Sequence, residues 1–134
     1  MMARISIITG AVFGFLSVAI GAFGAHALKP TLIQSGKLEV FELGVEYQFY
    51  HAFALLLNGI INHLLPSVRF KYASVCFMSG VTLFSGSLYL LSFAPLGMFG
   101  LLTPMGGVML LLGWALLAVG LIEKTKAFGR RPLQ

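Results

Sequence analysis

Charged residues are scarce in this sequence. Asp, Glu, Lys and Arg make up 10% of its 134 residues, and Asp is missing altogether. Ordinary globular domains carry about 25% charged residues, which keep their surfaces hydrated. The scarcity therefore excludes a soluble globular domain and a disordered tail. The formal net charge of +5 reflects the small number of acidic residues rather than a basic patch, so we expect no nucleic-acid partner.

Cysteine and polar linkers are scarce as well. The single cysteine, Cys76, excludes a disulfide framework and any metal site built from several cysteines. No low-complexity segment or soluble domain interrupts the chain, and we expect residues 1–134 to form a single transmembrane domain. What the sequence has instead is 58% hydrophobic residues and 16 glycines. This composition indicates an integral membrane protein whose helices pack closely in the lipid bilayer.

The few charges delimit the expected membrane spans. They leave three long uncharged intervals, and the last of these, between Lys71 and Glu123, is long enough for two spans. A helix needs about 20 apolar residues to cross a bilayer, and backbone groups in hydrocarbon must be hydrogen-bonded within the helix. The sequence therefore predicts an all-α integral membrane bundle of four transmembrane helices, which cover residues 5–26, 47–65, 72–93 and 103–122.

The lysines and arginines indicate how such a bundle is oriented. With four spans, most of these residues lie at the N-terminus, in the second loop and in the C-terminal tail, which would share one side of the membrane. Because cytoplasmic loops carry an excess of Lys and Arg, we expect both termini to be cytoplasmic.

The first loop, between the first two predicted spans, is the only sizeable segment expected outside the membrane. Apolar and acidic residues form two adjacent stripes in it at helical spacing: Leu38, Phe41 and Val45, and Glu39, Glu42 and Glu46. The pattern predicts a short amphipathic helix that lies on the outer surface and leads into the second span. Three Glu residues on one stripe can attract a cation, although such a stripe is more often a solvated face.

Glycines mark the faces on which the helices are expected to pack. In lipid, helices associate through close backbone approach, which small residues allow. On the first helix small residues recur every three or four positions, and on the last helix glycine recurs every seven. We expect packing at Gly10, Gly14, Gly21, Gly24, Gly86, Gly106 and Gly113. The sequence leaves open whether one of these faces instead contacts a second copy or a partner membrane protein.

Polar side chains within apolar helices are costly and need a structural or functional reason. The predicted topology brings several of them to the outer end of the bundle, where we expect a binding site. Its predicted residues are His26, Tyr47, Gln48, His51, Ser85, Ser87, Tyr89 and Thr103. Gln48 is close enough along the helix to orient the ring of His51. Plainer roles stay open: His26 can cap the first helix, and His51 can act as a hydrogen-bonding brace.

Four segments of the sequence resemble a known family. They are Gly21–Leu28 (GAFGAHAL), Tyr47–Ala52 (YQFYHA), Phe84–Leu90 (FSGSLYL) and Thr103–Gly107 (TPMGG). Together they are similar to domain-of-unknown-function family 423, which comprises small bacterial inner-membrane proteins similar to vertebrate transmembrane protein 256. The resemblance implies a multi-pass protein of the bacterial inner (cytoplasmic) membrane. It implies no reaction, substrate, cofactor or catalytic residue.

No acid–base pair or nucleophile motif of a known enzyme type is visible, and we expect no cofactor. The sequence thus favours a non-enzymatic module that binds a lipid or a partner membrane protein at its outer half. One alternative is a haem or metal protein, with His26 and His51 as the ligands. Another is a small transporter, for which Glu46 is the only candidate coupling carboxylate.

Overall fold

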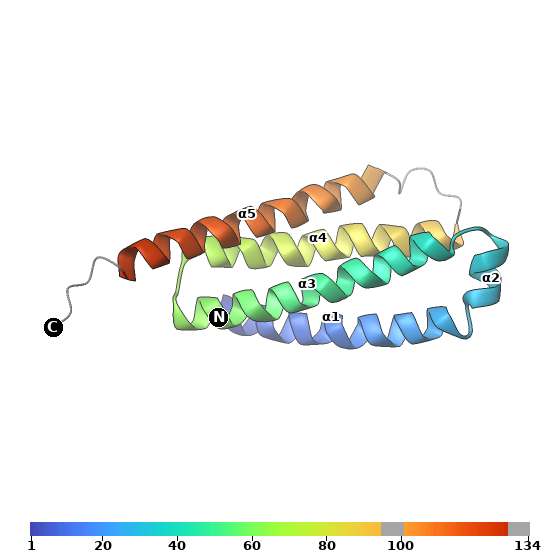
Figure 1. Ribbon diagram of the computed structural model, residues 1–134, viewed down its shortest axis with the longest axis horizontal. Helices are drawn as coiled ribbons and strands as arrows, with labels where there is room; N and C mark the ends of the chain where they lie inside the picture. Colours follow the sequence, from blue (N-terminus) through green and yellow to red (C-terminus); the bar gives the residue numbers. More distant parts are fainter. Residues whose placement is uncertain (95–100, 129–134) are drawn as a thin grey trace.

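Five helices make up most of the part of the chain that the structure, a computed structural model, describes: residues 1–94 and 101–128. The helices are α1 (Met2–Ala25), α2 (Lys29–Gln34), α3 (Leu38–Leu64), α4 (Val68–Phe93) and α5 (Leu102–Phe128). The four long ones run side by side in alternating directions (Figure 1). The start of α1 and the end of α5 lie at one end of the molecule, here called the terminal end, and α2 lies at the other, the α2 end.

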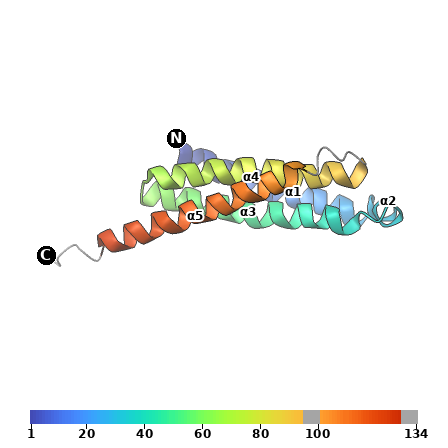
Figure 2. The same ribbon diagram turned by 90° about the horizontal axis from the view of Figure 1, so that it is seen from above.

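The long helices form an open row rather than a closed ring. α3 packs between α1 and α4, and α5 packs against α4. α1 and α4 touch only slightly, and α1 and α5 lie at opposite edges of the row (Figure 1). Figure 2 shows that α5 also crosses the other helices at an angle. Much of the helix surface therefore stays uncovered, and large apolar side chains such as Phe15, Phe53 and Leu111 are exposed on it.

The prediction of four transmembrane helices is wrong. Among the described residues, the helices long and apolar enough to cross a membrane are three: Met2–Ala25, Val68–Phe93 and Leu102–Ala127. α3 is as long as α5 but is not one of them, because it carries several uncharged polar residues between Gln48 and Asn62. A prediction based only on the intervals between charges counts such residues as apolar, and it therefore overestimates the hydropathy of this segment. The all-α fold and its apolar helices do fit a membrane bundle, but the cytoplasmic placement of both termini, derived from four spans, loses its basis.

The predicted amphipathic helix of the first loop is also placed differently. Residues 38–46 are the first turns of α3 itself, which continues without a break to Leu64. Phe41 in these turns is only 2% exposed and lies against Gly24 of α1, so the neighbouring helix covers this segment. The loop contains α2 instead. Gly36 follows α2 with a φ of 65°, a left-handed conformation that glycine adopts without strain.

Glycines of α5 and phenylalanines of α4 make the contact between these two helices. Both sets recur every seven residues along antiparallel helices, which pairs Gly106 with Phe84, Gly113 with Phe77, and Gly120 with Phe70. A Cβ atom on Gly113 would lie 2.7 Å from the ring of Phe77, and one on Gly106 would meet the backbone of Phe84. Such close approach supplies the dispersion contacts that hold helices together in lipid.

Glycines of α1 allow a similarly close approach to α3. A Cβ atom on Gly10 would lie 2.9 Å from the carbonyl oxygen of Ala52, and one on Gly24 would meet the ring of Phe41. These two glycines are separated by almost four helical turns. The backbones of α1 and α3 therefore stay close over much of the length of α1.

Three other glycines of the predicted packing set are less constrained. A Cβ atom on Gly21 would lie 3.2 Å from the side chain of Val45, and one on Gly14 would lie 3.8 Å from Ala52, which is an ordinary contact distance. Among the described residues, Gly86 has no neighbouring atom within 4 Å of its Cβ position. The space around Gly86 therefore gives no steric reason for a glycine.

Candidate functional site

The polar residues predicted at one pole fall into separate groups in the structure. Gln48 and Tyr89 form the first group. Gln48 Nε2 donates to the carbonyl oxygen of Phe13 on α1 at 3.0 Å, and its Oε1 accepts from the Tyr89 hydroxyl of α4 at 2.9 Å. The Gln48 amide therefore ties α3 to both of its neighbours. Both bonds lead away from His51, whose ring Gln48 was expected to orient.

His51 forms the second group with Trp114 of α5. Trp114 Nε1 donates to His51 Nε2 at 3.2 Å, while His51 Nδ1 lies 2.7 Å from the carbonyl oxygen of Tyr47. Since Nε2 accepts a hydrogen bond, Nδ1 must carry the proton and donate to Tyr47, and the ring is neutral in a single tautomer. The Tyr47 ring stacks on the imidazole at a centroid distance of 5.9 Å. Both nitrogens of His51 are thus engaged inside the protein.

Ser87 and Thr103 form the third group, where α4 ends and α5 begins. Their hydroxyl oxygens are 2.7 Å apart, which joins the two helices near the α2 end. Thr103 lies inside α5, which begins at Leu102, and its side chain bonds across to α4. Ser85, two residues before Ser87, is buried, and its hydroxyl has no hydrogen-bond partner among the described residues.

His26 lies apart from all three groups. It follows the last turn of α1 as its C-cap and is exposed. Gln48 bonds to Phe13, thirteen residues before His26, and His51 lies about one turn further toward the terminal end. At about 1.5 Å per residue, the two histidines are about 24 Å apart along the helix axes. They cannot ligate one haem or metal ion, and the described residues contain no cluster of three or more His, Cys, Asp or Glu side chains suited to a metal.

A further polar cluster lies nearer the terminal end, outside the predicted site. Asn58 of α3 is fully buried, and its Nδ2 donates to the Ser74 hydroxyl at 2.7 Å and to the Phe70 carbonyl oxygen at 2.9 Å. The Ser74 hydroxyl is 3.1 Å from that of Ser6 on α1. Three helices therefore meet at this cluster. The sequence did contain one signal for it, because Ser6 extends the small-residue face of α1 by one turn beyond Gly10.

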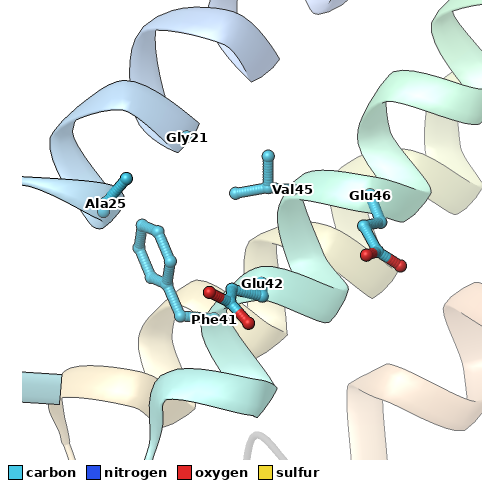
Figure 3. Close-up of a pocket in the computed structure, with 7 residues that line it drawn as sticks. Gly21, Ala25, Phe41, Glu42, Val45 and Glu46 are labelled. Atoms are coloured by element: carbon cyan, nitrogen blue, oxygen red, sulfur yellow. The ribbon is translucent and has the colours of Figure 1, made fainter. Parts of the chain in front are cut away.

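A groove between α1 and α3 opens at the α2 end. It has a volume of about 370 Å³ and is lined by Gly21, Gly24, Ala25, Phe41, Glu42, Val45 and Glu46. Figure 3 shows Phe41 and Val45 directed toward α1, with Glu42 and Glu46 beside them on successive turns of α3. A second hollow of about 270 Å³ adjoins it and is lined by Ser17, Val18, Val45, Glu46, Phe49 and Tyr50. We call the two hollows together the α1/α3 groove.

Another groove, of about 330 Å³, lies between α3 and α5. We call it the α3/α5 groove; it is lined by Tyr47, His51, Phe84, Gly107, Leu110, Leu111 and Trp114. Its walls are mostly aromatic and aliphatic, and the ring nitrogens of His51 and Trp114 already bond to each other. It therefore offers apolar surface with few free polar groups. The α1/α3 groove differs from it in carrying two carboxylates.

Only one of the two grooves contains residues of the predicted site. Of the eight predicted residues, Tyr47 and His51 line the α3/α5 groove, and none lines the α1/α3 groove. Glu42 and Glu46 belong to the acidic stripe that the sequence assigned to a surface helix. The sequence could have pointed to the α1/α3 groove, since a small-residue face on α1 precedes an acidic stripe on the next helix. The two features meet only because residues 38–46 belong to α3, whereas the predicted second span begins at residue 47.

Comparisons with known proteins find relatives over most of the chain. A family model described as "Protein of unknown function (DUF423)" matches residues 20–107, which include all four motif segments. The UPF0382 inner membrane protein YgdD of Escherichia coli (strain K12) is 42% identical over 125 residues, covering 92% of this chain and 93% of the relative. The UPF0382 membrane protein YwdK of Bacillus subtilis (strain 168) is 36% identical over 121 residues, covering 90% and 98%. No solved structure matches significantly.

Proposed function

The chain belongs to the DUF423 family of proteins of unknown function, and we propose that it is a non-enzymatic module that binds a lipid of the bacterial inner membrane. The family predicted from the four sequence segments is confirmed, and so is the location: the chain is a multi-pass inner-membrane protein. The family description assigns no reaction, so the proposal rests on the site itself.

The observation that carries this proposal is the α1/α3 groove, which matches the shape and chemistry of an amphiphile. α1 has 24 residues and is therefore about 36 Å long, whereas the hydrocarbon core of a bilayer is about 30 Å thick. The last turn of α1, beside Glu42, then lies at the level of the headgroups. The deeper part of the groove, beside Val18 and Phe49, faces hydrocarbon. A lipid bound there would place its headgroup at the first level and an acyl chain at the second.

The hydrogen bonds that engage Gln48 and His51 support binding rather than catalysis. General acid–base chemistry needs a side chain whose proton-accepting atom can reach a substrate. Both nitrogens of His51 are occupied by bonds to Trp114 and Tyr47, and both ends of the Gln48 amide are bonded to neighbouring helices. These residues are therefore better suited to hold the helices together than to act on a ligand.

Native mass spectrometry of the protein purified in mild detergent tests the proposal. Wild-type protomers should retain a phospholipid. Val18 is exposed and lines the groove, so Val18→Trp should fill the space for the acyl chain and weaken lipid binding about tenfold, which corresponds to about 1.4 kcal/mol and lowers the fraction of protomers that retain lipid.

Val12→Trp is the matched control, because Val12 is also an exposed valine of α1 but does not line the groove. This variant should retain lipid as the wild type does. Protomers free of lipid in every preparation would contradict the proposal. So would equal occupancies in the two Trp variants, or a stable protein partner occupying the groove in place of lipid.

A further inference from the structure

The α1/α3 groove has an unbalanced negative charge at the α2 end. Glu42 and Glu46 both line it and lie one turn apart on α3. Within residues 1–94 and 101–128, the one salt bridge joins Arg69 to Glu123, so neither carboxylate of the groove is paired with a basic side chain there. The third acidic residue of the stripe, Glu39, lines neither hollow of the groove. The two groove carboxylates therefore differ from a plain solvated acid on the same helix.

Contacts with α1 fix where these two carboxylates lie along the helix axis, and so at which depth of the bilayer. Their neighbours in the sequence, Phe41 and Val45, lie against Gly24 and Gly21 in the last turns of α1. A helix of the length of α1 that crosses the hydrocarbon core brings its last turn to the headgroup region. Nearby protein and lipid displace part of the water there, which strengthens the attraction between opposite charges relative to bulk solution.

We infer that the ligand of the α1/α3 groove is a lipid whose headgroup carries an ammonium group, held by Glu42 and Glu46. This inference rests on the proposed function and adds the class of headgroup. An ammonium group has three N–H donors and no acceptor, so both carboxylates can accept charge-assisted hydrogen bonds from it. The acyl chain follows the apolar wall of the groove past Val18 toward Phe49.

The charge of the site argues against an acidic lipid as its occupant. A phosphoglycerol headgroup carries a net negative charge and no cation, and it would bring that charge beside two unpaired carboxylates. An ethanolamine headgroup supplies the ammonium group that the carboxylates attract. The preference between two such lipids with identical acyl chains therefore isolates the contribution of the headgroup.

The test is a titration of the purified full-length protein with phosphatidylethanolamine or phosphatidylglycerol of identical acyl chains, followed by native mass spectrometry. We expect the wild type to bind the ethanolamine lipid about three- to tenfold more tightly, as suits exposed charge pairs. Glu42→Gln and Glu46→Gln should each reduce this ratio toward one while the protein still binds lipid. Raising the ionic strength should also reduce the ratio in the wild type, because salt screens exposed charges. This measurement needs no substitution, so it does not depend on how a variant folds.

Glu39→Gln is the control, because it removes one acidic charge from the same stripe without touching the groove. It should keep the wild-type ratio. Equal binding of the two lipids by the wild type would overturn the inference, as would a loss of preference in Glu39→Gln equal to that in Glu42→Gln. A complex of two copies that is lost in Glu42→Gln would overturn it as well, because a second copy would then fill the site.

If lipid is retained without headgroup preference, the proposed function stands and only this inference fails. If no lipid is retained, both fail.

Discussion

At the scale of single residues, hydrogen bonds between helices fix how the helices are aligned. Gln48 joins α3 to α1 and α4, His51 joins it to α5, and Asn58 joins it to α4. In lipid the hydrophobic effect does not drive helices together, so such bonds and close packing carry more of the association. Because each bond links particular positions, it fixes the position of one helix along the axis of its neighbour. Gln48, His51 and Asn58 of α3 are therefore used within the protein.

The bond between Trp114 and His51 should be measurable as a contribution to stability. Trp114→Phe keeps an aromatic ring but removes the indole N–H, so His51 Nε2 loses its donor. We expect the free energy of unfolding to fall by about 1 kcal/mol. Titration with sodium dodecyl sulfate, followed by circular dichroism, measures this change.

A double-mutant cycle isolates that bond from the change in ring size. His51→Phe is combined with Trp114→Phe, and the coupling energy between the two sites should be about 1 kcal/mol. A coupling energy near zero would show that the bond contributes nothing to the association of α3 with α5.

Asn58 should be the more costly residue to replace. Asn58→Ala removes two hydrogen bonds, to Ser74 and to the backbone of Phe70, and leaves a space in a fully buried position. We expect a loss of about 1–3 kcal/mol in the free energy of unfolding, measured by the same titration. Asn62→Ala is the comparison, because Asn62 accepts one bond of 3.3 Å from the backbone of Ser67 at the helix end. A cost for Asn62→Ala as large as that for Asn58→Ala would contradict the importance of the buried cluster.

At the scale of helices, the α4–α5 contact is a repeated pairing of a small residue with a large ring. The seven-residue period of the α5 glycines was visible in the sequence and indicated a packing face. The phenylalanines that fill the space beside these glycines were not identified, because two antiparallel repeats can be aligned in several registers. The structure selects the register that sets Gly113 against Phe77. Only the three-dimensional arrangement decides between registers that sequence spacing leaves equivalent.

This contact predicts a sharp difference between two glycines of α5. A Cβ atom on Gly113 would lie 2.7 Å from the Phe77 ring, whereas one on Gly107 would lie 3.8 Å from Phe84, an ordinary contact. Gly113→Ala should therefore reduce the free energy of unfolding by about 1–3 kcal/mol, since a closely packed interface must shift. Gly107→Ala should change it by no more than about 0.5 kcal/mol. Thermal or detergent unfolding of the two variants provides the measurement.

A second substitution tests whether the Phe77 ring is the cause. Phe77→Leu shortens the side chain that the new methyl group meets, so it should cost less in the Gly113→Ala background than in the wild type. Additive costs would show that Gly113→Ala destabilises α5 for another reason.

The sequence could predict where long apolar helices lie, but not which of them qualify as membrane spans. Charges and prolines mark helix ends well because both are costly inside hydrocarbon. Uncharged polar residues are harder to interpret, since Gln48 and Asn58 lower the hydropathy of α3 while their side chains face other helices. The residues of the predicted site also lie further apart than their spacing suggested. His51 was placed near the start of its helix, but α3 begins at Leu38, so His51 lies near its middle.

At the scale of the whole molecule, the open row leaves α5 attached along one side. α5 packs on α4, and its described side-chain bonds to other helices are few: Thr103 bonds to Ser87 near the α2 end, Trp114 bonds to His51 further along, and Glu123 pairs with Arg69 near the terminal end. The same openness leaves the α1/α3 groove on the flank of the molecule. The Ser87–Thr103 contact offers a direct test of how α5 is placed against α4.

A disulfide introduced at that contact should form within one molecule. The hydroxyl oxygens of Ser87 and Thr103 are 2.7 Å apart, so Ser87→Cys and Thr103→Cys, made together in a Cys76→Ser background, should oxidise readily. Non-reducing electrophoresis should show a monomer of altered mobility that reverts on reduction. Ser85→Cys with Thr103→Cys is the control and should cross-link poorly. Cross-linking of Ser87→Cys and Thr103→Cys between molecules instead of within one would contradict the α4–α5 arrangement.

The position of the α1/α3 groove also determines how a ligand would reach it. Because the groove opens on the side of the row between α1 and α3, a lipid would reach it by lateral diffusion within its leaflet, without crossing water. The relevant concentration is then the mole fraction of that lipid among its neighbours. Occupancy would follow the composition of the surrounding membrane in a graded manner, and the protein would report that composition continuously.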